Sequence, residues 1–305
     1  MSRYPKLNGL IAATFTPLRS DGTLNPKGVD AQVDHFLSRR VSGVFIGGTT
    51  GECHSLTVEE RLALARRWAE VTRGTPLKCI MHVGHHALPD ARRLAMEAER
   101  LGVHGISALA PGYFKPATLS DLVDVCGAIA GAAPSLPFYY YDIPAMTGVV
   151  QPMPEFLELA LERIPTLAGL KFTNPDFISL QRCLHLAGES VDVVYGSDEC
   201  LMAAWAFGVR GFVGSTYNHI APVARRIMGH LERGEWAEAR VEQMLVVEFV
   251  RLCARRGYLP AAKAAMGFLG LNCGPVRSPL HALDPAQISE LREELDQAGF
   301  NAWIH

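Results

Sequence analysis

Two kinds of hydrophobic pattern, one typical of strands and one typical of helices, alternate along the chain as far as residue 218. Short apolar runs bounded by Gly, Pro, Asn or Asp predict buried strands. After most of these runs, apolar positions recur every three to four residues, which predicts an amphipathic helix. The predicted strands cover residues 9–15, 43–47, 77–83, 104–109, 136–141, 166–171, 191–195 and 211–214.

The predicted helices begin at recognisable start signals. Pro26 stands in the first turn of a helix over 25–40, and Thr57 and Glu60 have the spacing of a capping box. Other helices are predicted at 89–101, 119–132, 153–163, 175–187 and 199–207. After Asn218 only helical patterns remain, at 221–233, 235–256 and 260–269.

Strands that each lead into a helix are typical of a parallel sheet. Eight such repeats in about 220 residues fit a closed (β/α)8 barrel better than an open sheet. The sequence therefore predicts an α/β protein with a (β/α)8 TIM barrel over 1–220 and a C-terminal helical extension over 221–305.

The amino-acid composition limits which classes of molecule this protein is expected to bind. The 305 residues are 49% hydrophobic and 20% charged, which suits a globular protein with a sizeable core. A formal net charge of -2 without a basic run argues against nucleic acid and anionic membranes as partners. No apolar run is long enough to cross a bilayer, and the segment 1–6 has no signal-peptide character.

Seven cysteines are scattered without a Cys-x-x-Cys pair. This usage predicts reduced thiols that act mostly as small core residues, and hence a cytoplasmic protein.

Lys171 is one of only six lysines, and it stands at the end of the sixth apolar run. Arginine keeps its proton, but a desolvated lysine can lose it, and the free amine then attacks carbonyl groups. Lys171 is therefore a candidate Schiff-base lysine. The alternative is a strand-end lysine whose amine reaches solvent.

Several polar residues follow predicted strands, and in a (β/α)8 barrel these positions form one active-site face. They are Thr49, Thr50, Tyr141, Lys171, Asp198 and Ser215. Their convergence from distant parts of the chain predicts a site at that face.

The Gly-rich loop 47–52 can turn backbone N–H groups and threonine hydroxyls toward a carboxylate or phosphate. The alternative interpretation is an ordinary turn.

Tyr139 and Tyr141 share one strand face. A phenol beside an amine can relay protons, whereas Tyr139 and Tyr140 fit aromatic core packing. Asp198 and Glu199 could bind hydroxyl groups or cap the following helix.

His82, His85 and His86 form a candidate metal site, since some barrel aldolases use a divalent cation. No nearby run supplies a convincing carboxylate or cysteine partner. Capping or loop hydrogen bonds are the better interpretation, and no metal is predicted.

Taken together, these segments resemble the N-acetylneuraminate lyase and dihydrodipicolinate synthase family over nearly the whole chain. The motifs are Gly-Gly-Thr-Thr-Gly-Glu at 47–52, Tyr-Tyr-Tyr-Asp-Ile-Pro at 139–144, Gly-Leu-Lys-Phe-Thr at 169–173, Gly-Ser-Asp-Glu at 196–199 and Gly-Ser-Thr-Tyr-Asn at 214–218. Each motif is weak alone, but the ordered set is specific.

The resemblance implies roles for these residues. Lys171 would form the Schiff base, and Tyr141 would relay protons. Thr49 and Thr50 would hold the pyruvate carboxylate, and Thr173 would line the site beside the lysine. The resemblance also implies a homotetramer in which Tyr113 reaches the site of a neighbouring subunit.

A few positions indicate which branch of the family the chain resembles most. The synthase branch has an arginine where this chain has Met146, which argues against synthase activity. Residues at the positions of Asp198, Glu199 and Ser215 contact the hydroxylated sugar tail in the lyase branch, and Gly196 belongs to the same substrate-binding set. Cys53 and His54 depart from the expected pattern and bring the hydratase-aldolase branch into consideration.

The resemblance thus implies a class I pyruvate-dependent carbon–carbon lyase that needs no cofactor and cleaves N-acetylneuraminate to pyruvate and N-acetylmannosamine. The alternatives are another pyruvate aldolase, hydratase-aldolase or dehydratase of the superfamily. A binding protein that has lost turnover is a further alternative, against which the presence of both Tyr141 and Lys171 argues.

Overall fold

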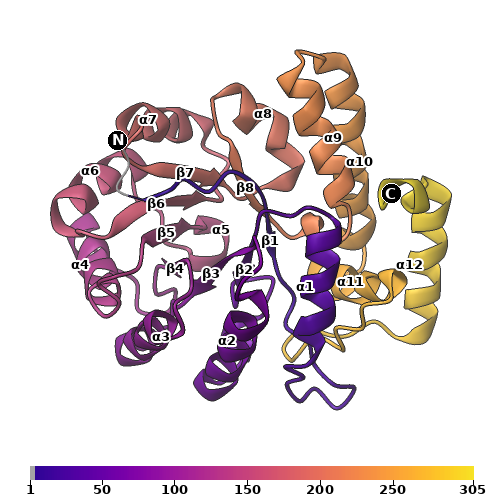
Figure 1. Ribbon diagram of the computed structural model, residues 1–305, viewed down its shortest axis with the longest axis horizontal. Helices are drawn as coiled ribbons and strands as arrows, with labels where there is room; N and C mark the ends of the chain where they lie inside the picture. The colour runs from indigo at the N-terminus through magenta and orange to yellow at the C-terminus, as the bar shows by residue number, and fades with distance from the viewer. Residues whose placement is uncertain (1–3) are drawn as a thin grey trace. The chain divides into compact units, whose positions relative to one another are not determined.

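The computed structural model describes residues 4–305, so residues 1–3 of the N-terminal segment lie outside the described residues. Eight parallel strands follow one another in chain order around a closed barrel (Figure 1). They are β1 (Gly9–Ala13), β2 (Gly43–Ile46), β3 (Lys78–His82), β4 (Gly105–Leu109), β5 (Phe138–Asp142), β6 (Leu167–Phe172), β7 (Asp192–Tyr195) and β8 (Gly211–Gly214). The predicted (β/α)8 fold is confirmed.

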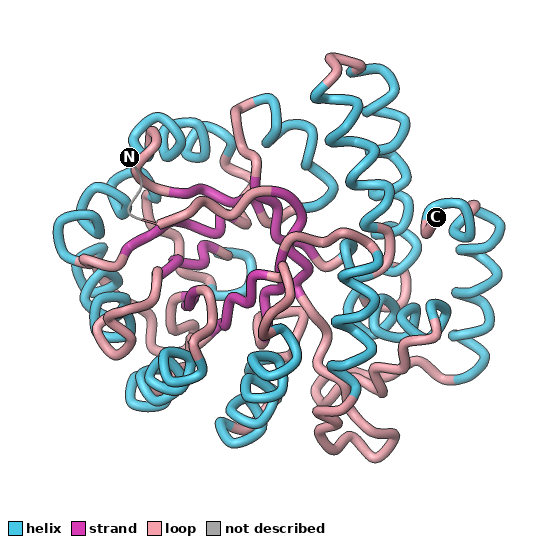
Figure 2. Tube along the Cα trace, in the orientation of Figure 1, coloured by secondary structure: helices cyan, strands magenta, loops and turns pink. Residues whose placement is uncertain are grey.

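Helices alternate with these strands and continue after the last one (Figure 2). The helices between strands are α1 (Gly28–Ser38), α2 (Val58–Thr72), α3 (Leu88–Leu101), α4 (Leu119–Ala130), α5 (Pro144–Thr147), α6 (Met153–Arg163), α7 (Phe177–Ala187) and α8 (Leu201–Ala206). Those after β8 are α9 (Ala221–Glu232), α10 (Trp236–Ala254), α11 (Tyr258–Ala265), α12 (Pro285–Ala298) and α13 (Phe300–Trp303). Short 3-10 turns lie at Cys53–Ser55, Asp198–Cys200, Thr216–Asn218 and Met266–Leu269.

Most predicted elements agree with these bounds to within a few residues. The capping box that begins α2 is present, with Thr57 accepting from the Glu60 backbone and Glu60 accepting from the Thr57 backbone. The segment predicted as one helix at 199–207 is instead a 3-10 turn followed by α8. The sequence does not predict α5. It predicts a helical extension over 221–305 but no separate bounds for α12 or α13, although Asp284 and Gln287 form a capping box at the start of α12.

The described chain forms two compact units. One comprises residues 4–9, 78–197 and 203–213, and the other comprises 10–77, 198–202 and 214–305. The predicted boundary between a barrel over 1–220 and an extension over 221–305 stays a prediction.

In the first unit, strands β3 to β7 are flanked by α3, α4, α6 and α7. Tyr140 of β5 packs on Phe156 of α6 with ring centroids 4.5 Å apart. Complete burial of one such aromatic side chain stabilises the fold by about 1.5–3 kcal/mol. A Cβ on Gly169 would lie 2.1 Å from the carbonyl oxygen of Asp192, so only glycine allows β6 and β7 to approach this closely.

In the second unit, aromatic contacts join helices that are distant in sequence. Phe36 of α1 stacks on Trp68 of α2 with centroids 6.4 Å apart, and Phe249 of α10 stacks on Phe300 of α13 at 5.9 Å. The first contact joins α1 to α2, and the second joins α10 to α13 among the helices that follow β8.

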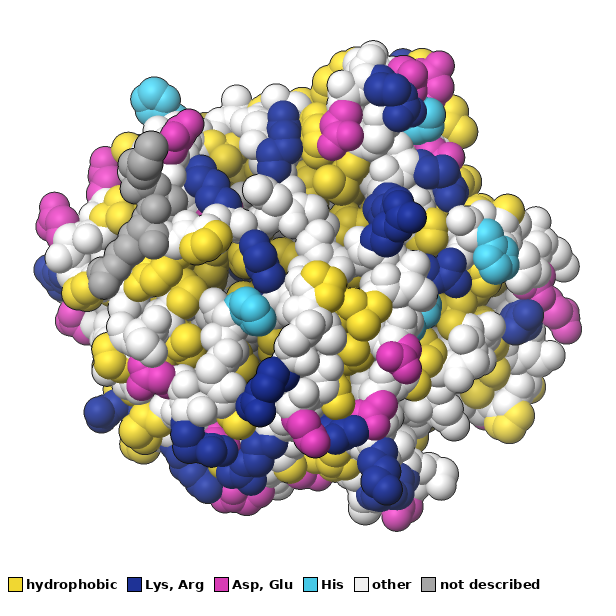
Figure 3. Space-filling model, in the orientation of Figure 1, with side chains coloured by type: hydrophobic (Ala, Val, Ile, Leu, Met, Phe, Trp, Pro, Cys, Tyr) yellow, Lys and Arg dark blue, Asp and Glu magenta, His cyan; other side chains and the backbone are white. Residues whose placement is uncertain are grey.

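Lys and Arg side chains lie among Asp and Glu side chains along the lower edge of the face in Figure 3. Ion pairs such as Arg226–Glu242 and Arg256–Glu294 account for part of the surface charge. Across residues 4–305, no helix combines the length and the hydropathy required to cross a membrane.

Candidate active site

Lys171 and Tyr141 lie opposite each other on neighbouring strands of the first unit. Lys171 of β6 is in register with Tyr141 of β5. Both side chains are buried, at 4% and 3% exposure, and the Lys171 Nζ atom lies 3.8 Å from the centroid of the Tyr141 ring. Strand β6 extends to Phe172, one residue beyond the predicted end at Lys171. The two ladder positions thus bring an amine and a phenol together within a buried region.

His82, at the end of β3, packs against the same tyrosine. It is fully buried, and its ring meets the Tyr141 ring edge-on with centroids 6.1 Å apart. A Cβ on Gly84 would lie 2.9 Å from His82 Nε2, so this glycine leaves room for the imidazole. The contact restricts the orientation of the Tyr141 ring. Within residues 4–305, no three His, Cys, Asp or Glu side chains are grouped so as to hold a metal ion.

Thr173 and Gly196 adjoin Lys171. A Cβ on Gly196 would lie 1.8 Å from Thr173 Oγ1 and 3.4 Å from Lys171 Cε, so position 196 must be glycine. The Thr173 hydroxyl is buried and has no hydrogen-bond partner among the residues that the structure describes. Buried hydroxyls normally have a partner, so this group is available to a ligand beside the lysine.

The loop 47–52 of the second unit forms a tight turn. The backbone N–H of Glu52 donates to the Thr49 carbonyl at 3.0 Å, and that of Cys53 donates to the Gly48 carbonyl at 3.2 Å. A Cβ on Gly51 would meet the Gly47 backbone at 3.2 Å. Thr49 and Thr50 are half-buried on this turn.

Asp198 lies in the 3-10 turn after β7 and is buried, at 4% exposure. Its Oδ2 accepts from the Thr216 backbone N–H at 2.8 Å. A Cβ on Gly214 would overlap Asp198 Oδ1 at 1.6 Å, so the carboxylate occupies the space beside β8. Glu199, the next residue, is exposed.

Ser215 follows β8, and its hydroxyl lies 2.7 Å from the hydroxyl of Tyr258 on α11. Burial, and then the nearby charge of Asp198, raises the pKa of the Tyr258 phenol well above its usual value, so the phenol stays neutral. The same two causes raise the pKa of Tyr217. The second unit therefore gathers a carboxylate and neutral hydroxyls, a set suited to hydrogen-bonding a polyol.

Sequence reasoning missed Tyr258. It lies 43 residues after Ser215, between the helices predicted at 235–256 and 260–269, and no local motif marks it. Tyr113, which the resemblance places at the site of a neighbouring subunit, is 78% exposed and packs edge-on against Phe114 with ring centroids 4.9 Å apart.

The sequence matches the model of the dihydrodipicolinate synthetase family over residues 6–298. The chain belongs to this family. The N-acetylneuraminate lyase of Xenopus tropicalis is 40% identical to this chain over 280 residues, covering 91% of this chain and 92% of that protein.

Solved structures agree with this membership. The N-acetylneuraminate lyase (sialic acid aldolase) of Aliivibrio salmonicida is 39% identical with a TM-score of 0.94, and the alignment covers 97% of this chain and 98% of that one. A sialic acid aldolase of Ruminococcus gnavus, solved as a catalytic lysine mutant, is 27% identical with a TM-score of 0.90 and covers 98% of each chain.

Proposed function

We propose that this protein is a class I carbon–carbon lyase that forms a Schiff base at Lys171 and cleaves N-acetylneuraminate to pyruvate and N-acetylmannosamine. The observation that carries the proposal is the buried Lys171 amine 3.8 Å from the Tyr141 ring. Relatives named N-acetylneuraminate lyase, similar over nearly their full length, support the choice of substrate. The catalytic lysine of the Ruminococcus gnavus enzyme supports the chemistry.

In the proposed reaction, the Lys171 amine adds to the C2 carbonyl of the open-chain keto acid and water leaves, forming an iminium. The iminium withdraws the electron pair of the C3–C4 bond when the C4 hydroxyl loses its proton, and the aldehyde product is released. Tyr141, together with the substrate carboxylate, takes that proton. The resulting enamine is protonated at C3, and hydrolysis releases pyruvate and the free lysine. No cofactor is required, because the lysine itself provides the electron sink.

We assign each remaining site residue to the part of the substrate that it would contact. Thr49 and Thr50 bind the carboxylate, and Thr173 and Gly196 line the site beside the lysine. Asp198, Glu199 and Ser215 bind the hydroxylated tail. The assignment is supported by the position of all these residues after barrel strands, where (β/α)8 enzymes carry their active sites. The buried Thr173 hydroxyl and the Asp198, Ser215 and Tyr258 cluster add support from each unit.

Other pyruvate aldolases, hydratase-aldolases and dehydratases of the superfamily are the alternatives. Synthase activity is disfavoured because Met146, which is 65% exposed on α5, offers no charge to a second carboxylate. A binding role without turnover remains the alternative of a different class, and an activity assay separates it from the lyase.

We infer that the active form is a cytoplasmic homotetramer that acts on a small 2-keto acid. Apolar side chains are exposed in the loops after β4 and β5, with Tyr113 at 78%, Phe114 at 86% and Val150 at 79% exposure. Exposed apolar side chains of this kind favour contact with another subunit. All seven cysteines are free thiols, which supports a reducing compartment.

Borohydride trapping tests the chemistry. Incubation with pyruvate and borohydride is expected to add a reduced pyruvyl group at Lys171, located by peptide mass spectrometry. Lys27→Arg, which changes an exposed lysine, should leave the label in place, whereas Lys171→Arg should abolish it. Labelling elsewhere contradicts the mechanism. Pyruvate release from a panel of keto acids that includes N-acetylneuraminate then tests the substrate.

A further inference from the structure

The loop 47–52 ends in a residue with unusual backbone geometry. Glu52 has φ 56° and ψ 40°, in the left-handed region that non-glycine residues rarely occupy. A strained backbone persists only where surrounding contacts determine it, and such residues cluster at functional sites. Contacts of the Glu52 side chain are therefore expected to hold the loop in shape.

Both carboxylate oxygens of Glu52 have partners from the C-terminal part of the second unit. Oε1 accepts from Lys263 Nζ of α11 at 2.6 Å, and Oε2 accepts from the Arg277 backbone N–H at 2.8 Å. The Lys263 and Glu52 side chains are 1% and 2% exposed. These two attachment points, one on α11 and one in the loop before α12, fix the direction of the carboxylate.

The ion pair is desolvated, so neither partner can be removed alone without leaving an uncompensated buried charge. Burial lowers the pKa of Lys263, and the adjacent Glu52 carboxylate opposes that shift. The side chain of Glu52 is thus held by an ion pair that is shielded from water.

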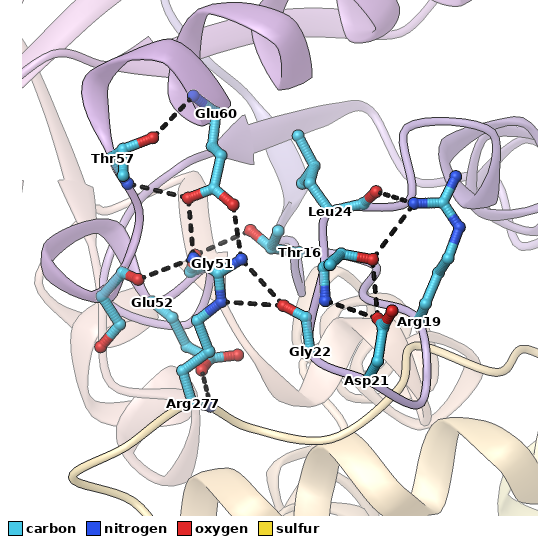
Figure 4. Close-up of polar contacts among 12 residues, drawn as sticks. Thr16, Arg19, Asp21, Gly22, Leu24, Gly51, Glu52, Thr57, Glu60 and Arg277 are labelled. Carbon is cyan, nitrogen blue, oxygen red and sulfur yellow. Dashed lines mark hydrogen bonds and ion pairs between the residues drawn. The ribbon is translucent and has the colours of Figure 1, made fainter.

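A second set of contacts anchors Arg277 itself (Figure 4). Its guanidinium donates to the Gly22 carbonyl at 2.8 Å and to Glu60 Oε2 at 2.7 Å. Figure 4 shows the Arg277 side chain between Glu60 and Gly22 while its backbone meets Glu52. Glu60 therefore helps to anchor Arg277, which is one of the two partners of Glu52. Glu242 of α10 is the matched comparison, because its carboxylate accepts from Arg226 Nε at 3.0 Å, outside the contacts of Glu52, Lys263 and Arg277.

We propose that Glu52 is a positioning residue that, through Lys263 and Arg277, holds the loop of Thr49 and Thr50 in the conformation that recognises the substrate carboxylate. This inference rests on the proposed function, since it assigns the loop to the carboxylate. Charge-assisted hydrogen bonds are strong only when the donors are oriented. Loss of the anchor should therefore reduce the preference for a carboxylate without removing Lys171.

The test compares pyruvate with pyruvamide, which keeps the ketone but lacks the charge. For each probe, the half-saturating concentration for borohydride labelling of Lys171 is measured. The ratio of the two concentrations reports carboxylate recognition. The principal variant is Glu52→Gln with Lys263→Met, which removes both charges and leaves no buried charge unpaired. Glu52→Asp keeps the charge but shortens the side chain, and Glu242→Gln, which removes the contact with Arg226, is the control.

The wild-type protein is expected to prefer pyruvate over pyruvamide. The double variant should lose on the order of tenfold in that ratio, chiefly through weaker pyruvate labelling. Glu52→Asp should lose preference in the same direction, while Glu242→Gln should keep the wild-type ratio even if its melting temperature falls. A purely structural role would lower stability and leave the ratio unchanged.

The outcomes separate the two proposals. Absence of pyruvate labelling at Lys171 in the wild type overturns the proposed function and this inference with it. Normal wild-type labelling with an unchanged ratio in the folded Glu52 variants overturns the positioning role alone. Should the double variant not fold, Glu52→Asp decides the question by the same ratio.

Discussion

The Lys171 amine lies 3.8 Å from the centroid of the Tyr141 ring, and the two residues occupy paired positions of β6 and β5. The backbone ladder thus sets their separation. Tyr139 lies two residues before Tyr141 on the same face of β5, and its hydroxyl donates to Asp192 Oδ2 at 3.2 Å. Two tyrosines of one strand therefore have different partners, and they can be compared directly.

Tyr141→Phe is expected to lower kcat for N-acetylneuraminate cleavage by about 10²- to 10⁴-fold, the usual contribution of one proton-transferring group. The phenol is removed, but the ring that packs against Lys171 and His82 is retained. Steady-state pyruvate release measures the effect. A kcat within about threefold of wild type would exclude Tyr141 as the proton relay.

Tyr139→Phe is the matched control. It removes the hydrogen bond to Asp192, which still accepts from the Leu7 backbone N–H at 2.7 Å. We expect a loss of about 1 kcal/mol in the free energy of unfolding and an unchanged kcat. Chemical denaturation and the same activity assay measure both quantities.

Ser215→Ala and Tyr258→Phe should each weaken N-acetylneuraminate cleavage, because the two hydroxyls are hydrogen-bonded to each other at 2.7 Å. Removing one such contact is expected to cost roughly 1–3 kcal/mol, about 5- to 150-fold in kcat/KM. Pyruvate does not extend to this part of the substrate, so borohydride trapping at Lys171 should stay near normal. Equal loss of trapping and cleavage would instead indicate a general disturbance of the fold.

The free energy of unfolding should fall as the pH is lowered from about 6.5 toward 3, in part because of His219. Burial lowers the pKa of His219 from 6.5 to about 3, so the unfolded chain binds a proton across this range and the folded chain does not. One such histidine contributes at most about 1.4 kcal/mol per pH unit.

His219→Gln removes this titration. Between about pH 7 and pH 5, the free energy of unfolding measured by denaturation should change less steeply with pH in the variant than in the wild type, whatever the absolute stability of the variant. Burial also lowers the pKa of His35, so the slope should decrease without vanishing. An identical slope in the two proteins would show that His219 is not the titrating group.

Subunit assembly is expected to depend on the exposed aromatic pair of the loop after β4. Replacing Tyr113 and Phe114 by serine should shift the sedimentation coefficient toward smaller species and lower activity, because apolar surface that another subunit covers is lost. Ile178→Ser on α7, where the isoleucine is 74% exposed, is the matched control and should not alter assembly. A monomeric wild-type protein with full activity would refute the tetramer.

Much of the fold could be predicted from the sequence, because strand and helix periods are local signals. The alternation of the two periods predicted eight strands and a closed barrel, and Thr57 with Glu60 marked the start of α2. Lys171 and Tyr141 could be selected because both stand at the ends of apolar runs, where the barrel carries its site. A strand end could be misplaced by one residue, as at Phe172, since burial continues smoothly across it.

What only the tertiary structure decided are the contacts between distant segments. The partner of Ser215 lies 43 residues away, and Glu52 meets Lys263 across 211 residues. The isolated lysine within the apolar sequence of α11 is a signal of a buried pair, but the sequence does not name its partner. Such pairings depend on how completed helices pack, which is set by the shape and burial of many side chains together rather than by any local pattern.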